Sequence, residues 1–174
     1  MVAPETSGGG DTAPQGAGAA EPLVAAAELA GPPGSPIHGV ITFTEVAGAV
    51  VVHAEITGVP DAGEHGFHVH DTGDCSAADF SSAGGHFNPA AAPHAGPHDS
   101  PRHAGDLGNF TTGADGTGTL DLTTDLLTVA EGPNAVVGRA VILHAARDDL
   151  ATQPTGNSGA RIACGVVHLG GPRP

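Results

Sequence analysis

Short apolar or alternating segments, separated by glycine and proline, recur along most of this 174-residue chain. None of them shows a sustained apolar period of 3.6 residues, so the sequence predicts little helix. The pair Asp115-Gly116 between two of them is a typical hairpin turn. Eight such segments predict an all-β protein, an antiparallel sandwich or barrel. The expected strands are residues 23–29, 39–44, 50–57, 66–70, 109–112, 118–124, 139–144 and 163–169.

Two expected connections, residues 71–106 and 145–160, are much longer than the others. Loops longer than about 12–15 residues are uncommon in compact domains and are usually functional. We therefore expect both of these connections to carry functional residues.

Residues 1–20 have a different composition, with many small residues and almost no large apolar ones. Such a segment buries too little surface to repay ordering, so we expect a flexible tail at 1–20 and one domain at 21–171. The tail lacks the charged and apolar regions of a signal peptide. A mature secreted protein, a tether behind a removed lipid anchor and a cytosolic protein with a disordered tail all fit this composition.

The net charge of −14 excludes nucleic acid and anionic membrane surfaces as expected partners. No run of 18 apolar residues occurs, so no membrane span is expected.

Histidine is the residue type with the clearest functional pattern in this chain. His68 and His70 alternate with Phe67 and Val69 in an expected strand, so the two imidazoles share one face while Phe67 and Val69 face the core. Imidazole is the most common transition-metal ligand in proteins. The pair therefore predicts a metal site on this strand.

Other potential ligands fall into two chemical groups. His94, His103 and Asp106 lie in a stretch rich in glycine and proline, and three nitrogen and oxygen donors suit zinc. His144 ends an apolar run and could join His68 and His70 in an all-imidazole site, which suits copper. His86, between the groups, could bridge two cations through both ring nitrogens. We expect surface solvation or core hydrogen bonds for the remaining histidines, which are His38, His53, His65, His98 and His168.

Six segments from Ile37 to Leu169 resemble, in order, the signature segments of copper–zinc superoxide dismutases. They are GFHVH, GGHFNP, HAGP, RHAGDLGN, VILHAARDD and TGNSGARIACGV. The resemblance implies an eight-stranded antiparallel Greek-key barrel with two long functional loops. It also implies conversion of superoxide to oxygen and hydrogen peroxide through Cu(II) and Cu(I), with zinc in a structural role.

The resemblance also assigns roles to individual residues. Copper would be held by His68, His70, His86 and His144, and zinc by His86, His94, His103 and Asp106, with His86 as the bridge. Asp148 resembles the carboxylate that ties a copper ligand to a zinc ligand. Arg161 resembles the cation that receives superoxide, so Arg161 and His86 are the expected catalytic residues.

Cys75 and Cys164 are compatible with free thiols, metal ligands or a disulfide when considered alone, although neither has zinc-ribbon spacing. They resemble the intrasubunit disulfide of the family. An early cysteine, in Gly73-Asp74-Cys75, resembles the secreted bacterial branch. We therefore expect a periplasmic or extracellular protein, with anchoring through the tail as an alternative. The family includes monomers and homodimers, and one sequence does not identify an interface.

The second long loop resembles a shortened version of the family's loop. It lacks the charged residues that guide superoxide in eukaryotic members, and Arg161 is the only cation that the family pattern places beside copper. A metal carrier on the same fold would be expected to lack a copper ligand or this arginine. A copper chaperone would carry an additional Cys-x-x-Cys module, which is absent from this chain.

Overall fold

The computed structural model describes residues 21–172, and the tail predicted for residues 1–20 lies outside the described residues. Eight strands and one short 3₁₀ helix, η1, make up the regular structure. The elements are β1 (Leu23–Ala30), β2 (His38–Val46), β3 (Ala49–Thr57), β4 (Gly63–His70), η1 (Ser81–Ala83), β5 (Asp106–Thr112), β6 (Gly118–Thr124), β7 (Ala140–His144) and β8 (Arg161–Leu169). The all-β prediction is confirmed.

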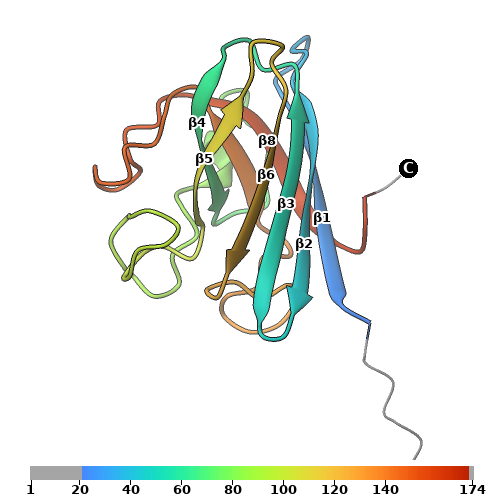
Figure 1. Cartoon of the computed structure of the whole chain (residues 1–174), viewed down its shortest axis with the longest axis vertical. Coiled ribbons are helices and arrows are strands. Elements are labelled where there is room, and N and C mark those ends of the chain that lie inside the picture. The colour runs from blue at the N-terminus through green and yellow to red at the C-terminus, as the bar shows by residue number, and fades with distance from the viewer. Residues whose placement is uncertain (1–20, 173–174) are drawn as a thin grey trace, which may run out of the picture.

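All eight strands belong to one antiparallel sheet with the order β5-β4-β7-β8-β1-β2-β3-β6. The Asp115-Gly116 turn joins β5 to β6 and brings the two edge strands side by side, so the sheet curls into a nearly closed barrel (Figure 1). The connections from β3 to β4 and from β6 to β7 each pass the two strands that separate them, which is Greek-key topology.

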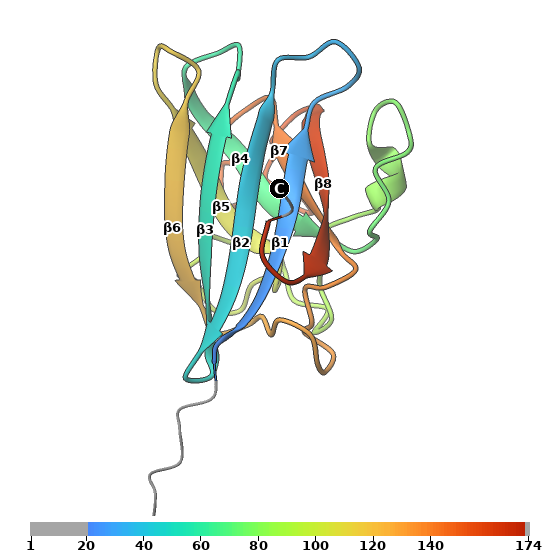
Figure 2. The same ribbon diagram turned by 90° about the vertical axis from the view of Figure 1, so that its right-hand side faces the viewer.

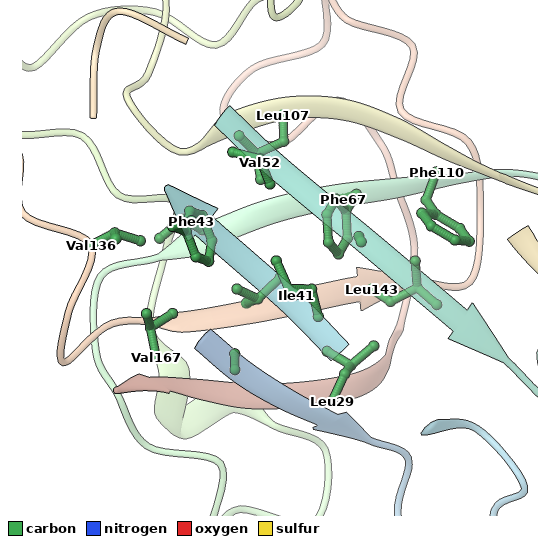
Figure 3. Packing of buried hydrophobic residues seen from close by; sticks show 14 of the residues in the cluster. Leu29, Ile41, Phe43, Val52, Phe67, Leu107, Phe110, Val136, Leu143 and Val167 are labelled. Carbon is green, nitrogen blue, oxygen red and sulfur yellow. The ribbon is translucent and has the colours of Figure 1, made fainter. Parts of the chain in front are cut away.

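The main hydrophobic core fills the barrel and consists largely of valine, isoleucine, leucine and alanine, with a few phenylalanines. Figure 3 shows Phe43 and Phe67 turned inward among Leu29, Ile41 and Leu143. Because side chains alternate along a strand, the neighbours of Phe67 on β4 point to the outside of the barrel.

The two long connections lie on the same side of the barrel, one after β4 and one after β7 (Figure 1). The segment around η1 stands beside β7 and β8 (Figure 2). A second, smaller apolar cluster fixes it there, formed by Phe80, Ala83, Ala140, Ile142 and Cys164.

Several strands begin earlier than the sequence predicts. β5 starts at Asp106 instead of 109, and β4 at Gly63 instead of 66. Gly108, which reads as a strand breaker, has φ +82° and lies where the β4–β5 register shifts between Gly66 and His68. A bulge absorbs the irregular residue, so the pairing continues to Asp106.

Candidate metal centre

His68 and His70 project from β4 to the outside of the barrel, opposite the buried Phe67 and Val69. Both histidines nevertheless have an exposed fraction of 0%. The long connections cover them, because Asp148 contacts the ring of His68 and the Gly84 carbonyl contacts that of His70. The two imidazoles are therefore enclosed between the barrel wall and the loops.

Three backbone hydrogen bonds form a ring among Val69, Phe87 and Gly105. The Val69 amide donates to Gly105 (3.0 Å), the Gly105 amide to Phe87 (2.9 Å), and the Phe87 amide to Val69 (2.8 Å). A Cβ atom on Gly105 would collide with the Val69 carbonyl, so this close approach requires glycine. Val69 and Phe87 are each adjacent to a ligand histidine, and Gly105 immediately precedes Asp106. The ring of hydrogen bonds therefore holds the three metal-binding segments together.

Four buried imidazole nitrogens have no hydrogen-bond partner in the described residues. They are His68 Nδ1, His70 Nε2, His86 Nε2 and His144 Nε2. The same four residues form a group whose ligand atoms lie within 4.8 Å of one another. Buried polar atoms are nearly always paired, so a cluster of unpaired nitrogens indicates a ligand-binding site. Four imidazoles are a donor set that suits copper.

The opposite nitrogen of three of these rings is held by an acceptor. His68 Nε2 donates to Asp148 (2.6 Å), His70 Nδ1 to the Gly84 carbonyl (2.9 Å), and His144 Nδ1 to the Gly159 carbonyl (3.2 Å). These acceptors fix the tautomer and leave the lone pair of each ring on the unpaired nitrogen. Burial lowers the pKa of His68 to about 3 and that of His144 to about 4, so both rings are neutral at physiological pH.

A second group contains His86, His94, His103 and Asp106. Asp106 Oδ1 lies 3.0, 2.9 and 3.1 Å from the Nδ1 atoms of the three histidines, in that order. The Nδ1 atoms of His86 and His103 are 3.3 Å apart. Tetrahedral zinc separates its donor atoms by about 3.3 Å, so three imidazoles and one carboxylate in this arrangement fit zinc.

Charge interactions oppose burial in this second group. Burial lowers the pKa of His94, but hydrogen bonds with Asp106 and Asp148 outweigh it and raise the pKa to about 9. Burial raises the pKa of Asp106, but hydrogen bonds from His86 and His94 hold it well below its usual value. A metal ion that binds here must therefore displace the proton of His94.

Asp148 connects the two groups. Its Oδ2 lies 2.6 Å from His68 Nε2 and its Oδ1 lies 2.9 Å from His94 Nε2. The backbone of Asp148 is held in turn by Asn109, which donates from Nδ2 to the Asp148 carbonyl and accepts from its amide. This carboxylate is 0% exposed, so both imidazoles are oriented by a fixed, water-excluded acceptor.

Arg161, at the start of β8, lies beside the four-histidine group. Its Nη1 donates to the Phe80 carbonyl (2.8 Å) and its Nη2 to the Gly84 carbonyl (2.6 Å). The Gly84 carbonyl also accepts from His70 Nδ1, so one oxygen positions the cation relative to a metal ligand.

The predicted disulfide is confirmed. Cys75 and Cys164 are bonded, with their Cα atoms 5.8 Å apart. The bridge ties the segment that carries Phe80 and Gly84 to β8, and Cys164 lies three residues after Arg161 on that strand.

The structure brings all seven ligand candidates together in two groups that share His86. None of the other described histidines joins either group. His65 is buried, and its Nδ1 donates to the His144 carbonyl (3.0 Å). Sequence reasoning missed the backbone and amide contacts at Gly84, Gly105 and Asn109. Only the close spacing of Gly105 to His103 and Asp106 could have suggested one of them.

Two comparisons with known proteins agree with this centre. A family model described as Copper/zinc superoxide dismutase (SODC) matches residues 37–167. A solved structure entitled "Crystal Structure Analysis of the clock protein EA4" is similar, with 42% sequence identity and a TM-score of 0.76. The similarity covers 89% of this chain and 99% of that chain. This chain belongs to the copper/zinc superoxide dismutase family, whose members are oxidoreductases that act on superoxide and use copper and zinc.

Proposed function

We propose that this superoxide dismutase binds copper through His68, His70, His86 and His144, and zinc through His86, His94, His103 and Asp106. The observation that carries the assignment is the set of four buried, unpaired imidazole nitrogens. Copper, when bound, supplies one-electron redox chemistry, and zinc supplies a fixed positive charge with no redox role.

Arg161 is proposed to bind the superoxide anion. Arg102, Arg139 and Arg147 each pair with a carboxylate, whereas within residues 21–172 Arg161 has no carboxylate within 4.0 Å. Its guanidinium is half-buried and held by two carbonyls, so its charge is oriented and remains available to an anion.

His86 is proposed to hold and release a proton at Nε2 when that nitrogen is not bound to copper. That nitrogen is buried and has no hydrogen-bond partner among the described residues, while Nδ1 of the same ring faces the zinc group. A proton at Nε2 therefore has no competing acceptor in the protein and can pass to the reduced substrate.

A dismutation assay combined with metal analysis tests this proposal. The purified protein is expected to hold one copper and one zinc per chain, and its activity should require copper. His86→Ala should weaken binding of both metals, whereas His98→Ala, in the same loop but exposed, should change little. Equal effects of the two substitutions would overturn the bridging role. Copper-loaded protein without activity would indicate a metal carrier instead.

The proposed location is the periplasm or the extracellular space. The disulfide supports it, because such bonds persist mainly in oxidising compartments. Cell fractionation tests the proposal, and recovery of the protein in the cytosol with free thiols would contradict it.

Among the described residues no helix is long and apolar enough to cross a membrane. A homodimer stays a prediction that sedimentation can test.

A further inference from the structure

Gln153, on the connection between β7 and β8, forms two side-chain hydrogen bonds with the backbone of His94 on the other long loop. The His94 amide donates to Gln153 Oε1 (2.7 Å), and Gln153 Nε2 donates to the His94 carbonyl (2.7 Å). This reciprocal pair imitates the pairing of two peptide groups in a sheet. It joins two residues that are 59 positions apart in the chain.

His94 depends on this contact more than the other members of the zinc group do. His86 forms a backbone bridge with His70, and Asp106 lies in β5. His94 belongs to no strand, and within the described residues its backbone makes no hydrogen bond except those with Gln153. Removing Gln153 would therefore leave the backbone amide and carbonyl of His94 without a hydrogen bond to any described residue.

The ring of His94 is held by the same connection. Asp148, five residues before Gln153, places its Oδ1 2.9 Å from His94 Nε2. One loop thus fixes both the backbone and the imidazole of a single zinc ligand.

We propose that Gln153 is a positioning residue that holds His94 in place and slows the release of zinc. The proposal rests on the assignment of His94 to zinc made above. The connection between β7 and β8, whose one cation Arg147 pairs with Glu64, would then serve the metal centre by holding the zinc-binding loop in place. Gln153 is exposed, so its truncation leaves no cavity in the core.

The rate of zinc release to a chelator tests this role. Gln153→Ala is expected to release zinc roughly 10–100-fold faster, the usual effect of removing a group that orients a metal ligand. Copper release should be unchanged, because His94 is not in the four-histidine group. Asn134→Ala is the matched control: its Nδ2 donates to the Leu126 carbonyl (2.6 Å), with no contact to either metal group. It should release zinc at the native rate.

Amide hydrogen exchange gives a second readout that a general loss of stability would not reproduce. In the copper(I)- and zinc-loaded protein, the His94 amide should exchange faster in Gln153→Ala while the Val69 amide stays protected. Gln153→Glu keeps an acceptor for the His94 amide but loses the donor to its carbonyl, so its zinc release should lie between the two rates.

The outcomes separate this proposal from the metal assignment. A native protein that binds no zinc would overturn both. Native zinc binding with an unchanged release rate in Gln153→Ala would overturn the role of Gln153 alone. Equal acceleration of zinc and copper release would also overturn it, because that result indicates general destabilisation.

Discussion

Glycine at position 156 lets the Asp148 carboxylate reach His94. A Cβ atom there would overlap the carboxylate and lie 2.6 Å from His94 Nε2, and the residue has φ +70°. Neither the overlap nor the backbone conformation suits another residue. The contact between the two metal groups thus depends on a residue that contributes no side chain.

Gly156→Ala should break the bridge between Asp148 and His94, lowering both zinc affinity and thermal stability. Gly132→Ala is the matched control, because Gly132 has φ +85° but nothing within 4 Å of its Cβ position. The control should cost about 1–2 kcal/mol for the left-handed backbone alone. Chelator titration and thermal unfolding measure both variants. Equal losses would show that the close approach at Gly156 has no energetic consequence.

Arg161 is expected to attract superoxide over a short range in a strongly acidic protein. Arg161→Gln should lower the second-order rate about 10–100-fold, the range for hydrogen bonds to charged groups. Arg147→Gln is the control with the same charge change, because Arg147 pairs at the surface with Glu64. The Debye length at physiological salt is about 8 Å, so distant carboxylates are screened. Stopped-flow rates should therefore change little with added salt, and a steep decrease would reveal a further set of guiding cations.

The ligands could be predicted from the sequence because residue type and spacing carry that information. The alternation around Val69 places two imidazoles on one face, and the apolar run before His144 marks a strand. The groups that orient them could not be predicted. The Gly84 carbonyl, which contacts both His70 and Arg161, is a backbone atom that every residue type possesses.

At the level of strands and loops, the apolar and alternating segments predicted all eight strands, but not where each strand begins and ends. β8 begins at Arg161 because His144 pairs with it across a register shift after Leu143. A bulge of this kind depends on the partner strand, so periodicity in one segment does not reveal it. The β4–β5 pairing around Gly108 has the same explanation.

The disulfide connects the loop after β4 to β8 and thereby supports Arg161. Replacing Cys75 and Cys164 with serine removes a link across 89 positions, which the chain-entropy account values at about 4–5 kcal/mol. We expect a lower melting temperature, faster amide exchange in residues 75–84 and reduced activity. Thermal unfolding, exchange and dismutation assays measure these effects. Full activity with unchanged exchange in this segment would show that the apolar cluster around Phe80 holds the loop without the bond.

For the whole molecule, the buried imidazoles make the metal-free protein sensitive to acid. Burial lowers the pKa of His68 to about 3 and of His144 to about 4, from 6.5. Below pH 6.5 the unfolded chain binds protons that the folded protein does not. The free energy of unfolding should therefore decrease as the pH decreases below 6.5, by up to about 1.4 kcal/mol per pH unit for each group.

The contribution of His94 to the free energy of unfolding has the opposite pH dependence, but it does not mask this loss. Its pKa is raised to about 9, so its contribution is complete below pH 6.5 and disappears as the pH rises through 9. Denaturant unfolding of the metal-free protein between pH 8 and 4.5 measures the balance. Bound metals should shift the loss to lower pH, because they compete with protons for the same nitrogens. Constant stability of the metal-free protein between pH 7 and 5 would contradict the burial argument.

Anomalous X-ray diffraction of the metal-loaded protein, collected at the copper and zinc absorption edges, tests the two-metal assignment most directly. The account predicts a copper peak about 2.0 Å from the unpaired nitrogens of His68, His70, His86 and His144. It predicts a separate zinc peak among the Nδ1 atoms of His86, His94 and His103 and the Asp106 carboxylate, with the His86 ring between the two peaks. A single peak, or two peaks that do not both contact His86, would contradict it.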